Sequence, residues 1–389
     1  MSRGQTTAPP PGWYPLLLAT ASIGIANSVV FTLLSDLQDK YHFSDAGLGL
    51  IAGSGFAVGL VGQLLLAPFA DRGHAKLLLL GGLGMAVAGS VLFALSSSLA
   101  MLVLSRAVVG FSNSLFLPAS RAMVISISDD DVGRRLGTIS GVELAGFVTG
   151  PVIGGLLVGP FGLRVPFLAA GSFALAGALM LAPRALPEPP IGERHRLAFD
   201  LLRLPRVRAG VLMSMALFLP VGFYDATLDR YLTDLGASNA LIGMGFLAYG
   251  IPFALLATTG GRIADRRGAL RVAFISTVLV GPMTAIYGFM HVPELIVGLS
   301  AVEGMVQAIG VPAAQAVVAE GAPRGRAAAA QGLAGSGNLL IAAITAYSAG
   351  TLYKHVGPAW MFSIAGTGVV CFGTMALTQR RRAPQAAVS

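Results

Sequence analysis

Four charged side chains stand inside long apolar stretches of this sequence, and their types suit the handling of protons. They are Arg106, Glu143, Asp225 and Glu303. Ionisable residues in a bilayer cost roughly 2.5 to 3.5 kcal/mol on insertion scales, so they usually face a water-filled cavity or a partner. Burial disfavours the charged form of a carboxyl group, whereas a nearby arginine favours it. A carboxyl group that moves between such environments can load and release a proton, and we predict proton coupling for these residues.

Each of these residues also has a structural interpretation. Arg106 could bind helix-end carbonyl groups or Asn27, and Glu143 could be a buried neutral residue that packs between helices. Asp225 and Glu303 could likewise have a structural role alone. The residue types therefore indicate candidates, and their surroundings must separate the two interpretations.

The apolar stretches that hold these residues predict transmembrane helices. The chain is 54% hydrophobic and 11% charged, with a mean hydropathy of +0.75, which is far from the roughly 25% charged residues of soluble domains. A helix needs about 20 apolar residues to cross a bilayer, and backbone groups in lipid must be satisfied internally. We predict an all-α membrane protein with twelve helices near residues 14–35, 46–67, 77–97, 99–123, 137–158, 163–183, 208–229, 240–260, 271–290, 294–316, 328–350 and 356–378.

The basic residues predict the orientation of these helices. With a cytoplasmic N-terminus, the external loops and helix ends hold only Lys40, Arg164, Arg230 and Lys354, and 21 of the 26 basic residues lie inside. This asymmetry follows the positive-inside rule and places both termini in the cytoplasm. It also explains the net charge of +8 through topology and anionic lipid rather than nucleic acid. Arginine outnumbers lysine 23 to 3, which favours a GC-rich bacterial genome and the bacterial cytoplasmic membrane.

The two halves of the sequence repeat one pattern at an offset of 194 residues. Asp71-Arg72 recurs as Asp265-Arg266. The same offset relates Gly110 to Gly304, Pro118 to Pro312 and Gly141 to Gly335. Such duplication is common in transporters whose substrate site lies between the halves. We predict two pseudo-symmetric six-helix bundles, residues 14–183 and 208–378, with a cytoplasmic linker at 184–207 and cytoplasmic tails at 1–13 and 379–389.

The duplicated loops resemble the signature G-x-x-x-D-R-x-G-x-x-R of the major facilitator superfamily. The second copy, Gly261 to Arg271, fits it well, whereas the first has Ala67, His74 and Leu77 at three signature positions. The resemblance covers essentially the whole chain and implies the fold of that superfamily. It also implies a conformational latch on the cytoplasmic side, which would involve Asp71, Arg72, Asp265 and Arg266. Otherwise these are only tight, positively charged loops.

A second motif resembles the drug/proton antiporters of the superfamily. Residues 141–155 fill the pattern G-x8-G-P-x-x-G-G of their fifth helix. Gly146, Gly150 and Gly154 recur every four residues and would form one smooth helix face, and a proline bends a helix. The alternative is a generic packing face of small residues. The signature residues are Gly141, Gly150, Pro151, Gly154 and Gly155.

Residues 102–110 are similar to the family segment L-x-x-x-R-x-x-x-G, whose arginine is linked to proton coupling. This resemblance makes Arg106 the first candidate for that task. Asn27, Tyr224 and Tyr249 are expected to line a substrate cavity, although aromatic residues in membranes often only pack against neighbours.

These features favour a proton-coupled efflux antiporter for hydrophobic or amphipathic molecules, working by alternating access. We expect small-molecule substrates, protons and lipids as partners, no nucleic acid, no cofactor, no metal site and a monomer. The sequence has no G-x4-G-K-S/T phosphate loop that would bind ATP. One alternative is an uptake or lipid-moving facilitator without proton exchange, in which the acidic residues bind a cationic or zwitterionic substrate. A membrane enzyme is disfavoured because no H-E-x-x-H motif occurs.

Overall fold

In the computed structural model of the chain, helices joined by short turns make up the part that is described. The structure describes residues 12–43, 45–127, 131–186, 189, 191 and 198–380. The α-helices are α1 (Trp13–Ser28), α2 (Leu34–Tyr41), α3 (Asp45–Phe69), α4 (Ala75–Leu95), α5 (Leu99–Ser126), α6 (Val132–Phe161), α7 (Arg164–Leu181), α8 (Pro205–Phe223), α9 (Asp229–Asp234), α10 (Asn239–Arg267), α11 (Ala269–Tyr287), α12 (Pro293–Gly321) and α13 (Ala327–Arg380). Short 3-10 or π-helical segments are η1 (Phe31–Leu33), η2 (Ala70–His74), η3 (Phe199–Arg203) and η4 (Tyr224–Leu228).

Within the described residues, ten helical segments are long and apolar enough to cross a membrane, and two of them are each long enough to cross it twice. One of these, Gly53–Leu95, is broken at Arg72 and Gly73, which have non-helical backbone angles. The other, Ala327–Gln379, is broken at Gly357, whose φ of 80° is in the region that favours glycine. The twelve crossings predicted from the sequence are thus confirmed.

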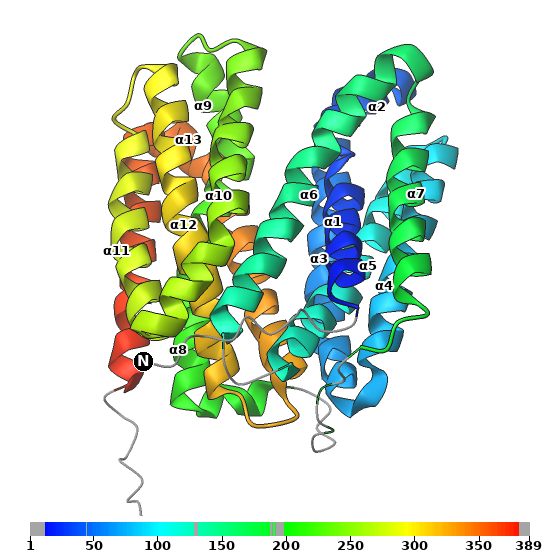
Figure 1. The fold of residues 1–389 in the computed structure, drawn as a ribbon. Coiled ribbons are helices and arrows are strands. Elements are labelled where there is room, and N and C mark those ends of the chain that lie inside the picture. The colour runs from blue at the N-terminus through cyan, green and yellow to red at the C-terminus, as the bar shows by residue number, and fades with distance from the viewer. Residues whose placement is uncertain are drawn as a thin grey trace, which may run out of the picture.

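The helices form two groups with separate cores. In the N-terminal half α4 and α3 pack on α5, and α1 packs on α6 and α7. In the C-terminal half α8 packs on α13, and α10 packs on α12. Phe116 and Leu83 are buried in the first core, and Tyr287 and Phe362 in the second. The all-α prediction and the two-bundle arrangement agree with this structure (Figure 1).

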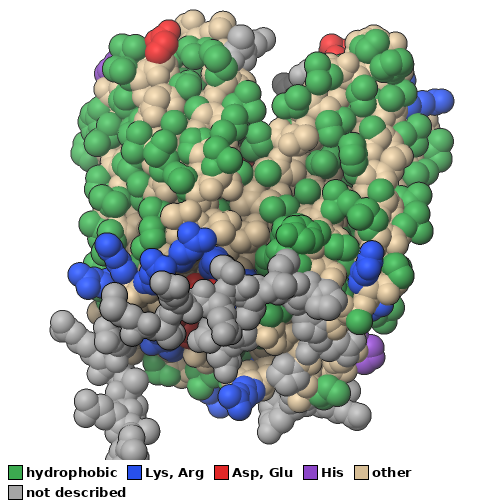
Figure 2. Space-filling model, in the orientation of Figure 1, with side chains coloured by type: hydrophobic (Ala, Val, Ile, Leu, Met, Phe, Trp, Pro, Cys, Tyr) green, Lys and Arg blue, Asp and Glu red, His purple; other side chains and the backbone are tan. Residues whose placement is uncertain are grey.

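The halves meet mainly where α6 packs on α10 and α12, and where α3, α5 and η2 pack on α13. In Figure 1 the two groups lie close together at the lower end and separate toward the upper end. The space-filling view shows a notch between them at the upper end, whereas lysine and arginine side chains gather toward the lower end (Figure 2). We call the lower end the basic end.

Some predicted boundaries differ from the structure. The first predicted helix, 14–35, is interrupted after Ser28, and its last residues belong to η1 and α2. Helix α8 begins at Pro205, three residues before the seventh helix expected from residue 208, and proline is well suited to the first position of a helix. The predicted tails at 1–13 and 379–389 lie largely outside the described residues.

Candidate functional site

Arg106 is buried in α5 and bound to the end of α1. The residue is only 2% exposed. Its Nη1 donates hydrogen bonds to the backbone oxygen of Asn27 at 2.5 Å and to Oδ1 of the same residue at 2.9 Å. Because α1 ends at Ser28, the Asn27 carbonyl group belongs to a last turn, whose acceptors have no partner within the helix. The guanidinium group also lies over the ring of Phe31, 5.0 Å from its centroid. The contacts foreseen by the structural interpretation of Arg106 are therefore present.

The Nε atom of Arg106 differs from Nη1 in its surroundings. Its Nε is buried and has no hydrogen-bond partner in the described part of the chain. A Cβ atom added at Gly55 of α3 would lie 2.9 Å from that nitrogen, so the glycine provides the room in which the side chain passes.

Asp225 brings an opposite charge to Arg106 from the other half of the molecule. It lies in the π-helical turn η4. Solvent reaches the residue, but nearby protein atoms still remove part of the water around its carboxyl group. The Asp225 carboxylate and the Arg106 guanidinium attract each other electrostatically but form no salt bridge within 4.0 Å. π-Helical turns occur frequently at functional sites. Two opposite charges, one from each half, therefore attract each other across the boundary between the halves.

Glu303 of α12 is the most enclosed of the candidate carboxyl groups, with the residue 1% exposed. The Tyr224 hydroxyl lies 3.0 Å from Oε2 and 3.1 Å from Oε1, and Gln307 Nε2 donates to Oε1 at 3.2 Å. The Tyr287 hydroxyl interacts with the same carboxyl group. Among the described residues, Glu303 forms no ion pair. Its hydrogen bonds therefore come from neutral side chains.

Aromatic rings surround this carboxyl group. The rings of Tyr224 and Tyr287 meet edge to face with centroids 5.5 Å apart, and each lies near Phe362. The Tyr224 hydroxyl is also 3.0 Å from Thr284 Oγ1. Tyr249 of α10 interacts electrostatically with Glu303. The structure thus brings two of the predicted cavity residues, Tyr224 and Tyr249, to Glu303, whereas the third, Asn27, lies at Arg106.

Glu143 belongs to a different place in the molecule. Its Oε2 forms an ion pair of 3.1 Å with Nη2 of Arg121, near the end of α5, and the two side chains are 27% and 12% exposed. This pairing differs from the interpretation of Glu143 as a neutral packing residue. It also separates Glu143 from the cluster around Glu303.

The aspartates of the duplicated loops connect the two halves at the basic end. Asp71 accepts hydrogen bonds from the backbone N–H groups of Ala328 at 2.9 Å and Ala329 at 2.8 Å, at the start of α13. Asp265 accepts them from Gly133 at 2.6 Å and Arg134 at 2.8 Å, at the start of α6. A carboxylate at a helix N-terminus satisfies free N–H groups and complements the helix dipole.

The two arginines of the predicted latch take no part in these inter-half hydrogen bonds. The Arg72 guanidinium lies 4.6 Å from the centroid of the Phe69 ring, on its own side of the boundary. Arg266 is exposed and lines a surface pocket. The hydrogen bonds described for this part of the predicted latch are therefore those of the two aspartates, Asp71 and Asp265.

The glycines of α6 serve two different helix contacts. A Cβ atom at Gly141 would meet the backbone of Ala254 in α10, whereas one at Gly146 or Gly150 would meet α1 or the residue that follows it. A Cβ atom at Gly154 would meet the segment after α1, at Val29 and at Thr32 of η1. Gly155 has open space around it, and the carbonyl group of Pro151 accepts a hydrogen bond from Thr32 at 3.2 Å. The face predicted for Gly146, Gly150 and Gly154 is the surface against which α1 and the following segment with η1 pack.

Comparison with known proteins identifies the family of this arrangement. The sequence model of the Major Facilitator Superfamily matches residues 16–228 and 209–389. The chain belongs to the Major Facilitator Superfamily. The fold agrees with the crystal structure of the human organic anion transporter MFSD10 (TETRAN), with a TM-score of 0.76, 20% identity, and coverage of 94% of this chain and 98% of the other.

Known proteins also match the sequence, over a smaller share of the chain than the structural match covers. The MFS-type transporter SLC18B1 of Homo sapiens is 23% identical over 287 residues, which are 69% of this chain and 62% of that protein. The vesicular acetylcholine transporter of Rattus norvegicus is 29% identical over 282 residues, 67% of this chain and 52% of that protein. The multidrug resistance protein MdtG of Proteus mirabilis (strain HI4320) is 26% identical, covering 79% of both. For the first two, the chain spans only about half to three fifths of the relative.

Sequence reasoning missed several residues that contact the candidate carboxyl groups. Tyr287 and Gln307 hold Glu303, and Arg121 pairs with Glu143. The signal for Gln307 was available, since it stands four residues after Glu303 on one helix face. Tyr287 and Arg121 lie on other helices, so only the packing of the bundle brings them to their partners.

Proposed function

We propose that this transporter exports hydrophobic or amphipathic small molecules in exchange for protons. The observation that carries the proposal is the buried Glu303 carboxyl group, held by neutral donors and with no ion pair among the described residues. Such a group is costly to keep charged in this position. It therefore has a physical reason to bind a proton when the surroundings close and to release it when water returns.

The orientation of the chain in the membrane sets the side from which the proton would arrive. The concentration of arginine and lysine at the basic end supports a cytoplasmic location for that end and for both termini, in a bacterial cytoplasmic membrane. With Asp71 and Asp265 holding the basic end closed, the described conformation is then open to the outside (Figures 1 and 2). An external proton would bind at Asp225 or Glu303 in this state, weaken the attraction for substrate, and leave after the basic end opens.

Relatives support a role in export without fixing the substrate. One resembling protein is named multidrug resistance protein MdtG, and its match covers 79% of both chains. The G-x8-G-P-x-x-G-G residues of α6 are similar to drug/proton antiporters. Tyr224 and Tyr249, which lie at Glu303, are partly exposed, and their aromatic rings suit a hydrophobic ligand.

A second candidate function is transport of a cationic substrate without proton exchange. The observation that favours it is the ring of tyrosines around Glu303, because aromatic faces and a carboxylate together attract a cation. Relatives from rat, human and mouse carry the name vesicular acetylcholine transporter. In this alternative Glu303 would bind the substrate itself.

Reconstitution in liposomes separates the two candidates. The full chain is placed in vesicles loaded with a fluorescent cationic dye or an uncharged hydrophobic dye, and a pH gradient is imposed in either direction. Antiport predicts that both dyes move faster against the proton flow and that proton movement appears only with substrate. Dye movement that ignores the pH gradient would reject proton coupling, and movement of the cation alone would favour the second candidate.

A further inference from the structure

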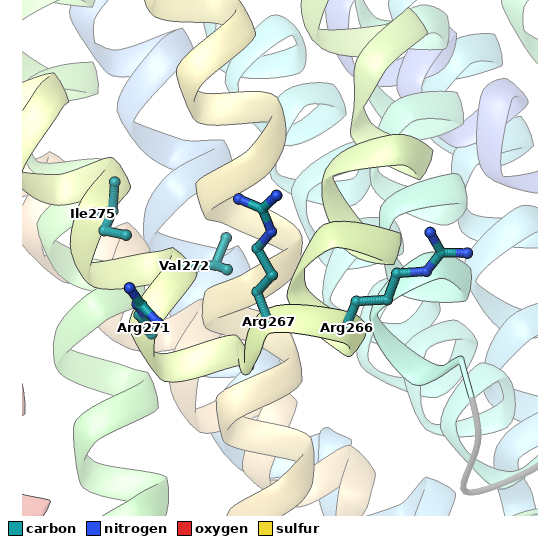
Figure 3. Close-up of a pocket in the computed structure, with 5 residues that line it drawn as sticks. All are labelled: Arg266, Arg267, Arg271, Val272 and Ile275. Atoms are coloured by element: carbon teal, nitrogen blue, oxygen red, sulfur yellow. The ribbon is translucent and has the colours of Figure 1, made fainter.

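A pocket at the basic end of α10 and α11 gathers three arginines beside apolar surface. Arg266, Arg267, Arg271, Val272 and Ile275 line it, and its volume is about 490 Å³ (Figure 3). The first two arginines end α10 and the third stands in the first turn of α11, so the short connection at Gly268 brings them together. Figure 3 shows the three side chains extending in different directions, with Arg267 between Arg266 and Arg271, so three positive charges line this part of the surface.

These arginines have unused hydrogen-bonding capacity. Arg266, Arg267 and Arg271 are exposed, and none forms an ion pair or a side-chain hydrogen bond with the part of the chain that is described. The nearby start of α11 has no side-chain cap. Guanidinium groups bind phosphate through paired N–H donors, so a phosphate group fits the chemistry of this pocket.

The apolar side of the pocket extends away from the arginines along one face of α11. Ile275, Val278 and Leu279 are 47%, 40% and 48% exposed. Together with Arg271 they are spaced at i, i+4, i+7 and i+8, which places them on the same side of a helix. A ligand that has a phosphate group and a long hydrocarbon chain would therefore meet the arginines at one end and apolar side chains along the rest.

The other half of the molecule lacks this arrangement. At the offset of 194 residues, Gly73 stands in place of Arg267 and Leu77 in place of Arg271. The remaining arginine, Arg72, lies over the ring of Phe69. The pocket is therefore not a general property of the duplicated loop, and the symmetric loop provides an internal reference.

We propose that this pocket binds the phosphate group of an anionic phospholipid in the leaflet at the basic end. The arginines that line the pocket, Arg266, Arg267 and Arg271, supply N–H donors and positive charge for the phosphate, and an acyl chain follows Ile275, Val278 and Leu279 of α11. The apolar face distinguishes a lipid from free phosphate, because free phosphate would gain nothing from it. The site is independent of the transported substrate and of proton coupling.

The test is native mass spectrometry of the full chain in detergent, titrated with phosphatidylglycerol and with phosphatidylcholine of the same acyl chains. Each arginine near an anionic lipid contributes about 1 kcal/mol, so R267Q/R271Q should weaken phosphatidylglycerol binding about thirty-fold, or about 2 kcal/mol. The control K76Q/R203Q removes two positive charges from the basic end outside the pocket and should retain the affinity. Equal thermal unfolding midpoints would show that the variants are folded.

Two further arms decide the source of the phosphate. The wild-type chain should prefer phosphatidylglycerol to phosphatidylcholine, a comparison that depends on no variant. Inorganic phosphate at millimolar concentration should not displace the lipid. Equal binding of the two lipids, unchanged binding in R267Q/R271Q, an equal loss in the control, or displacement by inorganic phosphate would each overturn the proposal.

Discussion

Tyr224 and Asp225 are consecutive residues, yet they interact with residues of different halves of the molecule. The Tyr224 hydroxyl lies within hydrogen-bonding distance of both Glu303 carboxylate oxygens, inside the C-terminal half. The Asp225 carboxylate is attracted to Arg106 of the N-terminal half. The π-helical turn η4 holds both residues. Any movement of this turn would therefore change the surroundings of the buried carboxyl group and the attraction between the halves together.

Replacing Glu303 by glutamine is expected to remove the response of transport to a pH gradient. The amide has nearly the shape of the acid but cannot exchange a proton, so proton-driven dye efflux from liposomes should fall at least tenfold. E294Q is the matched control, because Glu294 is exposed near the start of the same helix. If E303Q vesicles still accelerate efflux when the gradient is imposed, Glu303 is not the coupling residue.

The two aspartates at the basic end should differ in importance. Asp71 is 4% exposed, whereas Asp265 is exposed, and a hydrogen bond to a buried charged group contributes about 1.5 to 3 kcal/mol. D71N should therefore open the basic end more than D265N. The reporter is a cysteine at Ser336, which is buried in α13 near the backbone of α3, in a chain whose Cys371 is replaced by serine.

The measurement is the rate at which this cysteine reacts with a water-soluble maleimide. We expect D71N to raise the rate about tenfold and D265N to raise it only a few-fold. Similar rates for the two variants would mean that burial does not set the strength of these contacts. The reporter chain without either substitution gives the baseline.

Two glycines of the α6 motif should respond differently to the same substitution. A Cβ atom at Gly150 would lie 2.8 Å from the Ile25 oxygen and 2.9 Å from the Val29 nitrogen in or beside α1, whereas Gly155 has nothing within 4 Å. G150V should lower stability by about 1 to 3 kcal/mol, the usual cost of overpacking. G155V should unfold at the wild-type temperature in detergent. Equal unfolding temperatures for both variants would contradict the packing described for α1 and α6.

The ion pair of Arg121 and Glu143 should show coupling in a double-mutant cycle. R121Q and E143Q each leave one charge without its partner, so the sum of the two losses should exceed the loss in R121Q/E143Q. Because Glu143 is partly exposed, solvent weakens the pair, and we expect a coupling free energy of about 0.5 to 2 kcal/mol. Additive losses in urea unfolding would show that the pair contributes nothing measurable.

The sequence by itself determined the membrane architecture. Hydropathy, the placement of basic residues and internal repeats can all be recognised without knowing which residues meet in space. Lengths of apolar sequence indicate twelve crossings, and the repeated Asp71 and Asp265 indicate two related halves. It also identified which ionisable residues the bilayer would isolate. The resemblance of the loops and of α6 to known motifs pointed to the superfamily that the comparisons then identified.

Only the tertiary structure decided what each of these residues contacts. Glu143 and Glu303 are both acids within apolar helices, but one pairs with Arg121 and the other is held by Tyr224 and Gln307. The partners of Asp71 are backbone groups more than 250 residues away, and no local pattern encodes such a contact. Helix packing sets these distances through many small contacts along the whole interface, so the electrostatic surroundings of a buried charge emerge only when the bundle has formed.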